Sequence, residues 1–165
     1  MAIGKPFNLQ KWIQENKDLL KPPVGNKNLY VESEDYIVMI VGGPNARKDY
    51  HYNETEELFY QLEGEITVYI QENGKKKAMK LSAGDMYLHP AKVPHSPART
   101  EGSVGLVIER KRAGKGFNDG LLWLIRQVQY HHHFVSTIAS FICHDLPWKI
   151  HFQSFKIGIV RKCAI

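Results

Sequence analysis

Cysteine is scarce in this sequence: there are only two, Cys143 and Cys163, and both stand near the C-terminal end. The long stretch before them therefore has no cysteine for an internal disulfide, which excludes the class of small secreted domains held together by a disulfide framework. Low cysteine content is typical of proteins in a reducing compartment. We therefore expect a cytoplasmic protein.

Long hydrophobic runs are also missing. A membrane-spanning helix needs about 20 consecutive apolar residues, and the apolar runs, such as those within 134–143, are too short. The segment from Met1 to Pro6 lacks the apolar region of a secretory signal. These features predict a protein that neither crosses a membrane nor is exported.

The chain has no strong excess of charge of one sign on any single segment. Its 165 residues carry a formal net charge of +5, with 24% charged and 43% hydrophobic residues, which is ordinary for one soluble globular domain. The basic residues are scattered, as in 75–77 and 110–112, without the interleaved aromatic residues of single-strand binders. We expect a small-molecule partner, attracted if anionic by the basic surface, and no nucleic acid.

Turn-forming residues recur at short intervals and separate short strand-like segments. These are 36–41, 57–62, 65–71, 77–81, 86–89 and 104–109, and a further short strand is expected at 29–32. The Asn73-Gly74 pair predicts a hairpin turn. One helix is expected within 8–20, capped by Asn8 and ended by Pro22 and Pro23. The pattern predicts an all-β fold, a small jelly-roll β-barrel with a short N-terminal helix.

Three side chains form a candidate metal site. His51 and Glu57 flank a short polar bend, and His95 follows 38 residues after Glu57, directly after Val93-Pro94. Period-two alternation places Glu57 on the same strand face as Phe59 and Gln61, so its carboxylate can point into a barrel. Two imidazoles and one carboxylate leave open positions on a metal and suit non-haem iron(II), although zinc accepts the same donors.

Four segments carry a resemblance to a known family: 42–51 (GGPNARKDYH), 56–64 (EELFYQLEG), 90–97 (PAKVPHSP) and 104–110 (VGLVIER). They resemble the 3-hydroxyanthranilate 3,4-dioxygenase family of the cupin superfamily, over residues of about 5 to 123. The family lacks the second histidine of the general cupin pattern, and Asn53 stands at that position here. His89, in contrast to His95, falls where the pattern commonly has an apolar residue, so we expect it to be structural or near the surface.

The resemblance implies a cupin fold, an iron(II) cofactor and a ring-cleaving reaction. The family converts 3-hydroxyanthranilate and O2 to 2-amino-3-carboxymuconate semialdehyde, which closes to quinolinate on the route from tryptophan through kynurenine to NAD. A homodimer is also a family expectation.

The resemblance also implies roles for individual residues. His51, Glu57 and His95 would bind the metal, and Glu57 would also contact the substrate and take part in catalysis. Arg99 would bind the substrate carboxylate, and Glu109 would bind the substrate and accept its proton. Arg47 would be catalytic and lie at the oxygen position, while Val24 and Asn26 would line the substrate. Exposed arginines more often form surface ion pairs, and Glu109 could simply end a strand that reaches the surface.

The C-terminal part departs from the family pattern. The two Cys-x-x-Cys pairs of bacterial and fungal members are missing after Trp123, so an altered reading frame or splice form near residue 124 is one hypothesis. We expect a cupin domain over 1–112 and an atypical extension over 113–165, and loss of the segment that covers the pocket would weaken substrate positioning. Two alternatives remain open: a cupin enzyme of different specificity, and a non-catalytic cupin that binds a small acid or a partner.

Overall fold

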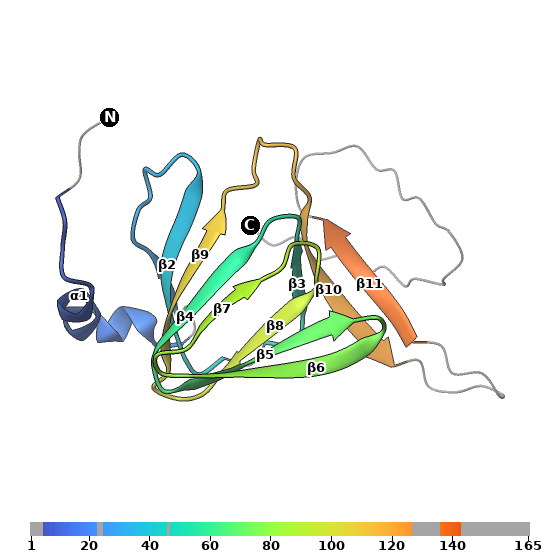
Figure 1. The fold of residues 1–165 in the computed structure, drawn as a ribbon, viewed down its shortest axis with the longest axis horizontal. Coiled ribbons are helices and arrows are strands. Elements are labelled where there is room, and N and C mark those ends of the chain that lie inside the picture. The colour runs from blue at the N-terminus through green and yellow to red at the C-terminus, as the bar shows by residue number, and fades with distance from the viewer. Residues whose placement is uncertain (1–4, 23–24, 46, 127–135, 143–165) are drawn as a thin grey trace.

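The computed structural model describes residues 5–22, 25–45, 47–126 and 136–142 and shows two antiparallel sheets that face one another (Figure 1). One sheet has the strand order β1-β2-β9-β4-β7, and the other has the order β11-β10-β3-β8-β5-β6. The elements are α1 (Leu9–Glu15), the 3-10 helix η1 (Lys17–Leu20), β1 (Asn26–Asn28), β2 (Tyr36–Gly42), β3 (Tyr50–Asn53), β4 (Glu57–Glu63), β5 (Glu65–Glu72), β6 (Lys75–Ser82), β7 (Met86–His89), β8 (His95–Arg99), β9 (Val104–Arg110), β10 (Asp119–Arg126) and β11 (Ser136–Ile142).

The N-terminal helix begins as predicted and ends earlier. The Asn8 side chain accepts a hydrogen bond from the backbone N–H of Lys11, which caps α1. The α-helix ends at Glu15, and the chain continues as the 3-10 helix η1. The prediction of a strand at 29–32 is wrong. The strand in this region is β1 (Asn26–Asn28), which pairs with β2 in the register Asn26↔Val41. The described residues contain no helix long and apolar enough to cross a membrane.

The core between the sheets follows from the alternation predicted for β4. Phe59, at the middle of β4, packs with Val107 of β9 and with Ile66 and Val68 of β5. Ile70 and Leu81 complete the buried cluster. β5 and β6 form a hairpin through the predicted Asn73-Gly74 turn. β6 is therefore the edge strand of the sheet that carries β8.

A second cluster lies on the outer side of the other sheet. Ile13 of α1 and Leu20 of η1 pack on Ile40 of β2 and Val104 of β9. The two helical segments therefore cover one end of this sheet face. At its other end, side chains such as Leu88 and Met86 stay exposed, with 54% and 64% of their surface accessible.

The segment after β2 is held tightly against β8. A Cβ on Gly43 would meet the carbonyl oxygen of Thr100 at 2.0 Å, so no side chain fits at this position. Asn45 then accepts a hydrogen bond from the Arg99 backbone N–H at 2.9 Å and donates one to the Pro97 carbonyl at 2.8 Å. These contacts fix the strand that carries His95 and Arg99. The all-β architecture with a short N-terminal helix, predicted from the sequence, is confirmed.

Candidate metal and substrate site

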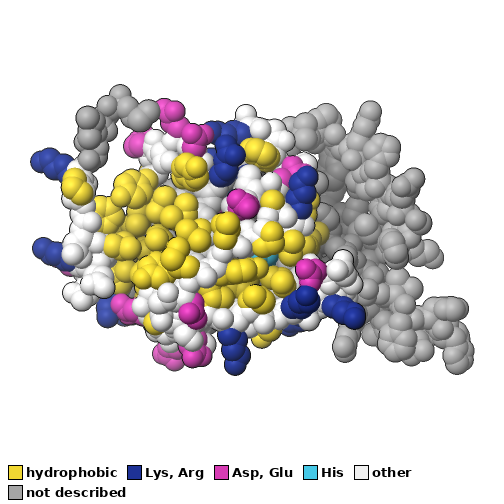
Figure 2. Space-filling model, in the orientation of Figure 1, with side chains coloured by type: hydrophobic (Ala, Val, Ile, Leu, Met, Phe, Trp, Pro, Cys, Tyr) yellow, Lys and Arg dark blue, Asp and Glu magenta, His cyan; other side chains and the backbone are white. Residues whose placement is uncertain are grey.

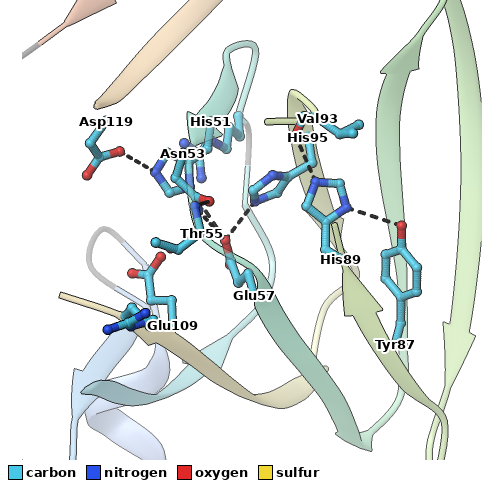
Figure 3. A network of polar contacts seen from close by, with 12 residues as sticks. His51, Asn53, Thr55, Glu57, Tyr87, His89, Val93, His95, Glu109 and Asp119 are labelled. Atoms are coloured by element: carbon cyan, nitrogen blue, oxygen red, sulfur yellow. Dashed lines mark hydrogen bonds and ion pairs between the residues drawn. The ribbon is translucent and has the colours of Figure 1, made fainter. Parts of the chain in front are cut away.

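The three candidate metal ligands meet between the two sheets (Figure 3). His51 of β3 and His95 of β8 are register partners in one sheet, and Glu57 of β4 comes from the opposite sheet. One potential ligand atom from each of the three lies within 4.8 Å of the others. The sandwich therefore brings two imidazoles and a carboxylate to one point.

Glu57 is the centre of this cluster. The residue is 5% exposed, and its Oε2 lies 3.0 Å from His95 Nε2 and 3.6 Å from His51 Nδ1. Asn53 donates a hydrogen bond to the same oxygen at 3.3 Å. Burial opposes ionisation, but the hydrogen bonds and charges of the two histidines outweigh it and hold the pKa of Glu57 below its usual range. Glu57 is therefore a carboxylate, the form that binds a cation.

His51 is held from its other side by a second carboxylate. Its Nε2 lies 2.7 Å from Asp119 Oδ1, in hydrogen-bond contact. Burial alone would lower the pKa of His51, but the hydrogen bonds to Asp119 and Glu57 raise it to about 9. Without a metal, the His51 ring therefore carries a proton on both nitrogens at neutral pH. A metal that binds this ring must displace one of these protons.

The residues present fit a divalent cation. His95 is 1% exposed, and its Nδ1 has no hydrogen-bond partner among the described residues. The cluster presents two imidazoles and an ionised carboxylate, the donor types that divalent transition metals bind. A metal ligand histidine commonly donates its second N–H to a carboxylate, as His51 can to Asp119.

His89 is not a fourth ligand in this cluster and is not near the surface. It is 1% exposed, and its ring centroid lies 4.3 Å from that of His95. Its Nε2 is 2.8 Å from the Val93 carbonyl, and the Tyr87 hydroxyl is 3.1 Å from its Nδ1. Burial and the neighbouring His95 lower the pKa of His89 to about 4. A neutral ring donates to Val93 and accepts from Tyr87, so the structural interpretation of His89 holds.

Arg99 is a buried cation without a carboxylate partner among the described residues. It is 6% exposed, and its Nη1 has no hydrogen bond there. Burial, helped by the charge of Arg47 and opposed by that of Glu57, lowers the pKa of Arg99 to about 10. The group still carries its charge at neutral pH. An unpaired buried guanidinium is costly, so it is explained best by an anionic ligand.

A small residue makes room for this guanidinium. A Cβ on Gly105 of β9 would lie 2.9 Å from Arg99 Nη1 and 3.0 Å from Gln61 Oε1. Gln61 is buried, and its Oε1 also has no partner in the described part of the chain. Gly105 therefore leaves the space that the heads of both side chains occupy.

Glu109 lies beside Glu57 on the neighbouring strand, in direct register. It is buried, and Arg112 donates a hydrogen bond to its Oε2 at 2.9 Å. Burial and the Glu57 charge raise the pKa of Glu109 despite the opposing charge of Arg112. A carboxylate whose pKa is raised takes up a proton more readily than an ordinary glutamate, which suits a proton acceptor.

Three predicted residues remain, and for them the structure shows no contact with the metal cluster among the described residues. Arg47 forms an ion pair with Asp49 at 2.8 Å, and about a third of its side chain is exposed. Asn26 is an exposed residue of β1. Val24 lies outside the described residues. The roles of Arg47 and Asn26 stay predictions.

Two residues that the sequence did not single out join the site. Asp119 and Arg112 form an ion pair, with 2.9 Å between Asp119 Oδ2 and Arg112 Nε. Asp119 is far from His51 in sequence and meets it only because β10 pairs with β3. The Asp-Gly pair at 119–120 was a visible signal, since it opens a strand within the resembling part of the chain.

The sequence comparisons identify the family. The family described as 3-hydroxyanthranilic acid dioxygenase matches residues 1–152, which is further than the motifs up to Trp123 indicated. A protein of Xanthomonas euvesicatoria pv. vesicatoria named 3-hydroxyanthranilate 3,4-dioxygenase is 50% identical over 125 residues, covering 76% of this chain and 69% of its own. A Bacillus thuringiensis protein of the same name is 45% identical over 161 residues, covering 96% and 89%.

Solved structures resemble the fold at low sequence identity. A protein from Neisseria meningitidis aligns with a TM-score of 0.51 at 16% identity and covers 65% of this chain and all of its own. A cupin-2 domain protein from Shewanella frigidimarina aligns with a TM-score of 0.49 at 21% identity, over 63% of this chain and all of its own. With the family match over most of its length, this chain belongs to the 3-hydroxyanthranilic acid dioxygenase family.

Proposed function

We propose that this chain is a 3-hydroxyanthranilate 3,4-dioxygenase. It takes 3-hydroxyanthranilate and O2 to 2-amino-3-carboxymuconate semialdehyde, on the route from tryptophan through kynurenine to quinolinate and NAD. The observation that carries the proposal is that the His51, Glu57 and His95 cluster occurs together with the buried guanidinium of Arg99, which has no carboxylate partner in the described part of the chain. A metal centre beside an anion site is what a benzoate substrate with adjacent hydroxyl and amine groups requires.

Iron(II) is the proposed cofactor, held by the two histidines and Glu57. A bound iron(II) supplies open coordination positions and redox chemistry to the substrate and oxygen. Zinc accepts the same donors but supplies no redox chemistry. A reducing cytoplasm keeps iron in the ferrous state, which supports the proposed cytoplasmic location.

The chain's own residues then bind and orient the substrate. Arg99 pairs with the substrate carboxylate through two parallel hydrogen bonds, the geometry that suits a guanidinium fork. This contact satisfies the buried charge of Arg99 and fixes the rotation of the ring. The Glu109 carboxylate takes the proton of the substrate hydroxyl or amine, a role supported by its raised pKa. Arg47 is proposed to stabilise negative charge at the oxygen position, and Asn26 and Val24 to line the substrate.

The proposed catalytic domain covers 1–112, and the atypical extension covers 113–165. Within the extension, β10 adds to the sheet beside β3 and delivers Asp119 to His51. The extension therefore supports the metal site in addition to any part in covering the pocket.

The activity is tested by loading the purified chain with iron(II) without air and then adding 3-hydroxyanthranilate in aerated buffer. We expect one O2 consumed for each substrate and an absorbance from the semialdehyde that decays as it closes. The same chain without iron is the control. Iron binding without oxygen uptake would favour the non-catalytic cupin, and uptake only with other substrates would favour a cupin enzyme of different specificity.

We propose that the chain forms a homodimer through the exposed outer face of the sheet that carries β4. Figure 2 shows hydrophobic side chains gathered over the part of the molecule where Figure 1 places β2, β9, β4 and β7. Tyr36, Met86 and Leu88 are more than half exposed there, and apolar patches of this kind mark interaction sites. Sedimentation analysis should give twice the monomer mass, and Leu88→Glu should yield monomers. A monomeric wild-type chain at micromolar concentration would contradict the dimer.

A further inference from the structure

Arg112 occupies a fixed position between two acidic residues of the site. The residue follows the end of β9 and is 7% exposed. Its Nη1 donates to Glu109 Oε2 at 2.9 Å and to the Arg110 carbonyl at 2.8 Å, while its Nε lies 2.9 Å from Asp119 Oδ2. Two hydrogen bonds from Nη1 and the ion pair with Asp119 hold the guanidinium between the two carboxylates, while Nε itself makes no hydrogen bond in the described part of the chain.

On one side, Arg112 acts on the metal ligand His51 through Asp119. The two oxygens of Asp119 have different partners, His51 Nε2 on Oδ1 and Arg112 on Oδ2. Contacts at both oxygens restrict rotation of the Asp119 carboxylate. They therefore fix the side from which Asp119 contacts the His51 ring. Groups that orient a metal ligand in this way typically change metal affinity by about 10- to 100-fold when they are replaced.

On the other side, Arg112 acts on Glu109 directly. Glu109 lies in register with Glu57, and two neighbouring carboxylates repel each other. The hydrogen bond from Arg112 offsets this repulsion and keeps the Glu109 carboxylate in place. One guanidinium therefore contacts the support of the metal ligand and the proposed proton acceptor at the same time.

We propose that Arg112 is a positioning residue that couples the two halves of the site, orienting His51 through Asp119 and Glu109 by direct contact. The Glu109 half rests on the proposed function, whereas the His51 half rests on the metal cluster alone.

The metal half is tested by titrating cobalt(II), as a stable substitute for iron(II), into the metal-free chain and following its visible absorption. Arg112→Lys keeps the charge but loses the planar fork, and we expect it to weaken cobalt affinity by about 10- to 100-fold. Asp119→Asn keeps the shape but offers one acceptor oxygen to two donors, and the same loss is expected. Arg110→Lys is the matched control, because Arg110 is exposed and stacks near Phe117.

The coupling is tested by combining the changes. If Arg112 acts through Asp119, the double variant Arg112→Lys/Asp119→Asn loses less affinity than the product of the single losses. At saturating iron(II), Arg112→Lys should still lower kcat by about tenfold, as a misplaced proton acceptor does. Glu109→Gln should lower kcat while keeping cobalt affinity within about twofold of wild type, because Glu109 belongs to the second half only.

The two proposals fail separately. A wild-type chain that consumes no oxygen overturns the proposed function, yet the cobalt affinities still decide whether Arg112 orients His51. Cobalt affinity of Arg112→Lys equal to that of Arg110→Lys overturns the inference. If Arg112→Lys does not fold, Asp119→Asn decides, and unchanged cobalt affinity in this variant overturns it.

Discussion

Replacement of His95 by alanine is expected to lower metal affinity by at least about 100-fold, since replacing only the outer partners of ligands already costs about 10- to 100-fold. His95 is fully enclosed, and its Nε2 lies 3.0 Å from the Glu57 carboxylate. Without this ring the cation keeps two protein ligands, and the site cannot hold it against dilute chelator. Cobalt titration with a competing chelator measures the loss, and oxygen uptake should disappear with it.

His89→Gln is the matched control for this experiment. His89 is as buried as His95 and lies against it, but its two nitrogens contact Val93 and Tyr87. A glutamine can donate and accept in the same way, so we expect metal affinity within several-fold of wild type. Equal metal loss in both variants would show that general damage to this part of the core, and not ligand loss, explains the His95 result.

Replacement of Arg99 by methionine is expected to raise the KM for 3-hydroxyanthranilate by roughly 100-fold, about 3 kcal/mol for a charge-assisted, paired hydrogen bond. Arg99 is buried with a free Nη1 and no carboxylate partner among the residues described. Methionine fills similar space without a charge. Steady-state kinetics over a wide substrate range, together with cobalt titration, separates substrate binding from metal binding.

The same variant carries a prediction about stability. Because an unpaired buried charge is costly, Arg99→Met should leave the melting temperature of the substrate-free protein unchanged or raise it. Loss of function with retained or increased stability is the signature of a residue kept for its ligand. A KM equal to that of wild type, or metal loss as large as the substrate loss, would argue against a substrate role for Arg99.

Local sequence patterns determined which residues form the site and which face of its strand a residue such as Glu57 occupies. Alternation along β4 places Glu57 on the buried side with Phe59 and Gln61, and the burial pattern of the strand follows it. Asn8 caps the helix because its side chain reaches the nearby Lys11 backbone, a contact within one turn. The Asn73-Gly74 turn depends likewise on neighbours in sequence.

Local patterns failed where distant segments had to meet. The strand expected at 29–32 was misplaced, because pairing with β2, and not residue preference, decides where β1 lies. The sequence predicts a structural or near-surface His89, and only the packing of β7 against β8 shows that this residue is fully enclosed beside His95. Arg112 gave no signal of its own, and the Asp119-Gly120 pair gave no indication that Asp119 contacts His51, since an isolated acid or base is usually a surface residue.

The sequence by itself therefore determined the donor set, the all-β class and the family, because each depends on residue type and short spacing. Only the tertiary structure decided how these residues act together. The register of β3 with β10 brings Asp119 to His51, and the register of β4 with β9 sets Glu109 beside Glu57. Such contacts depend on strand pairing between distant segments, and a shift of one residue would turn every side chain to the opposite face.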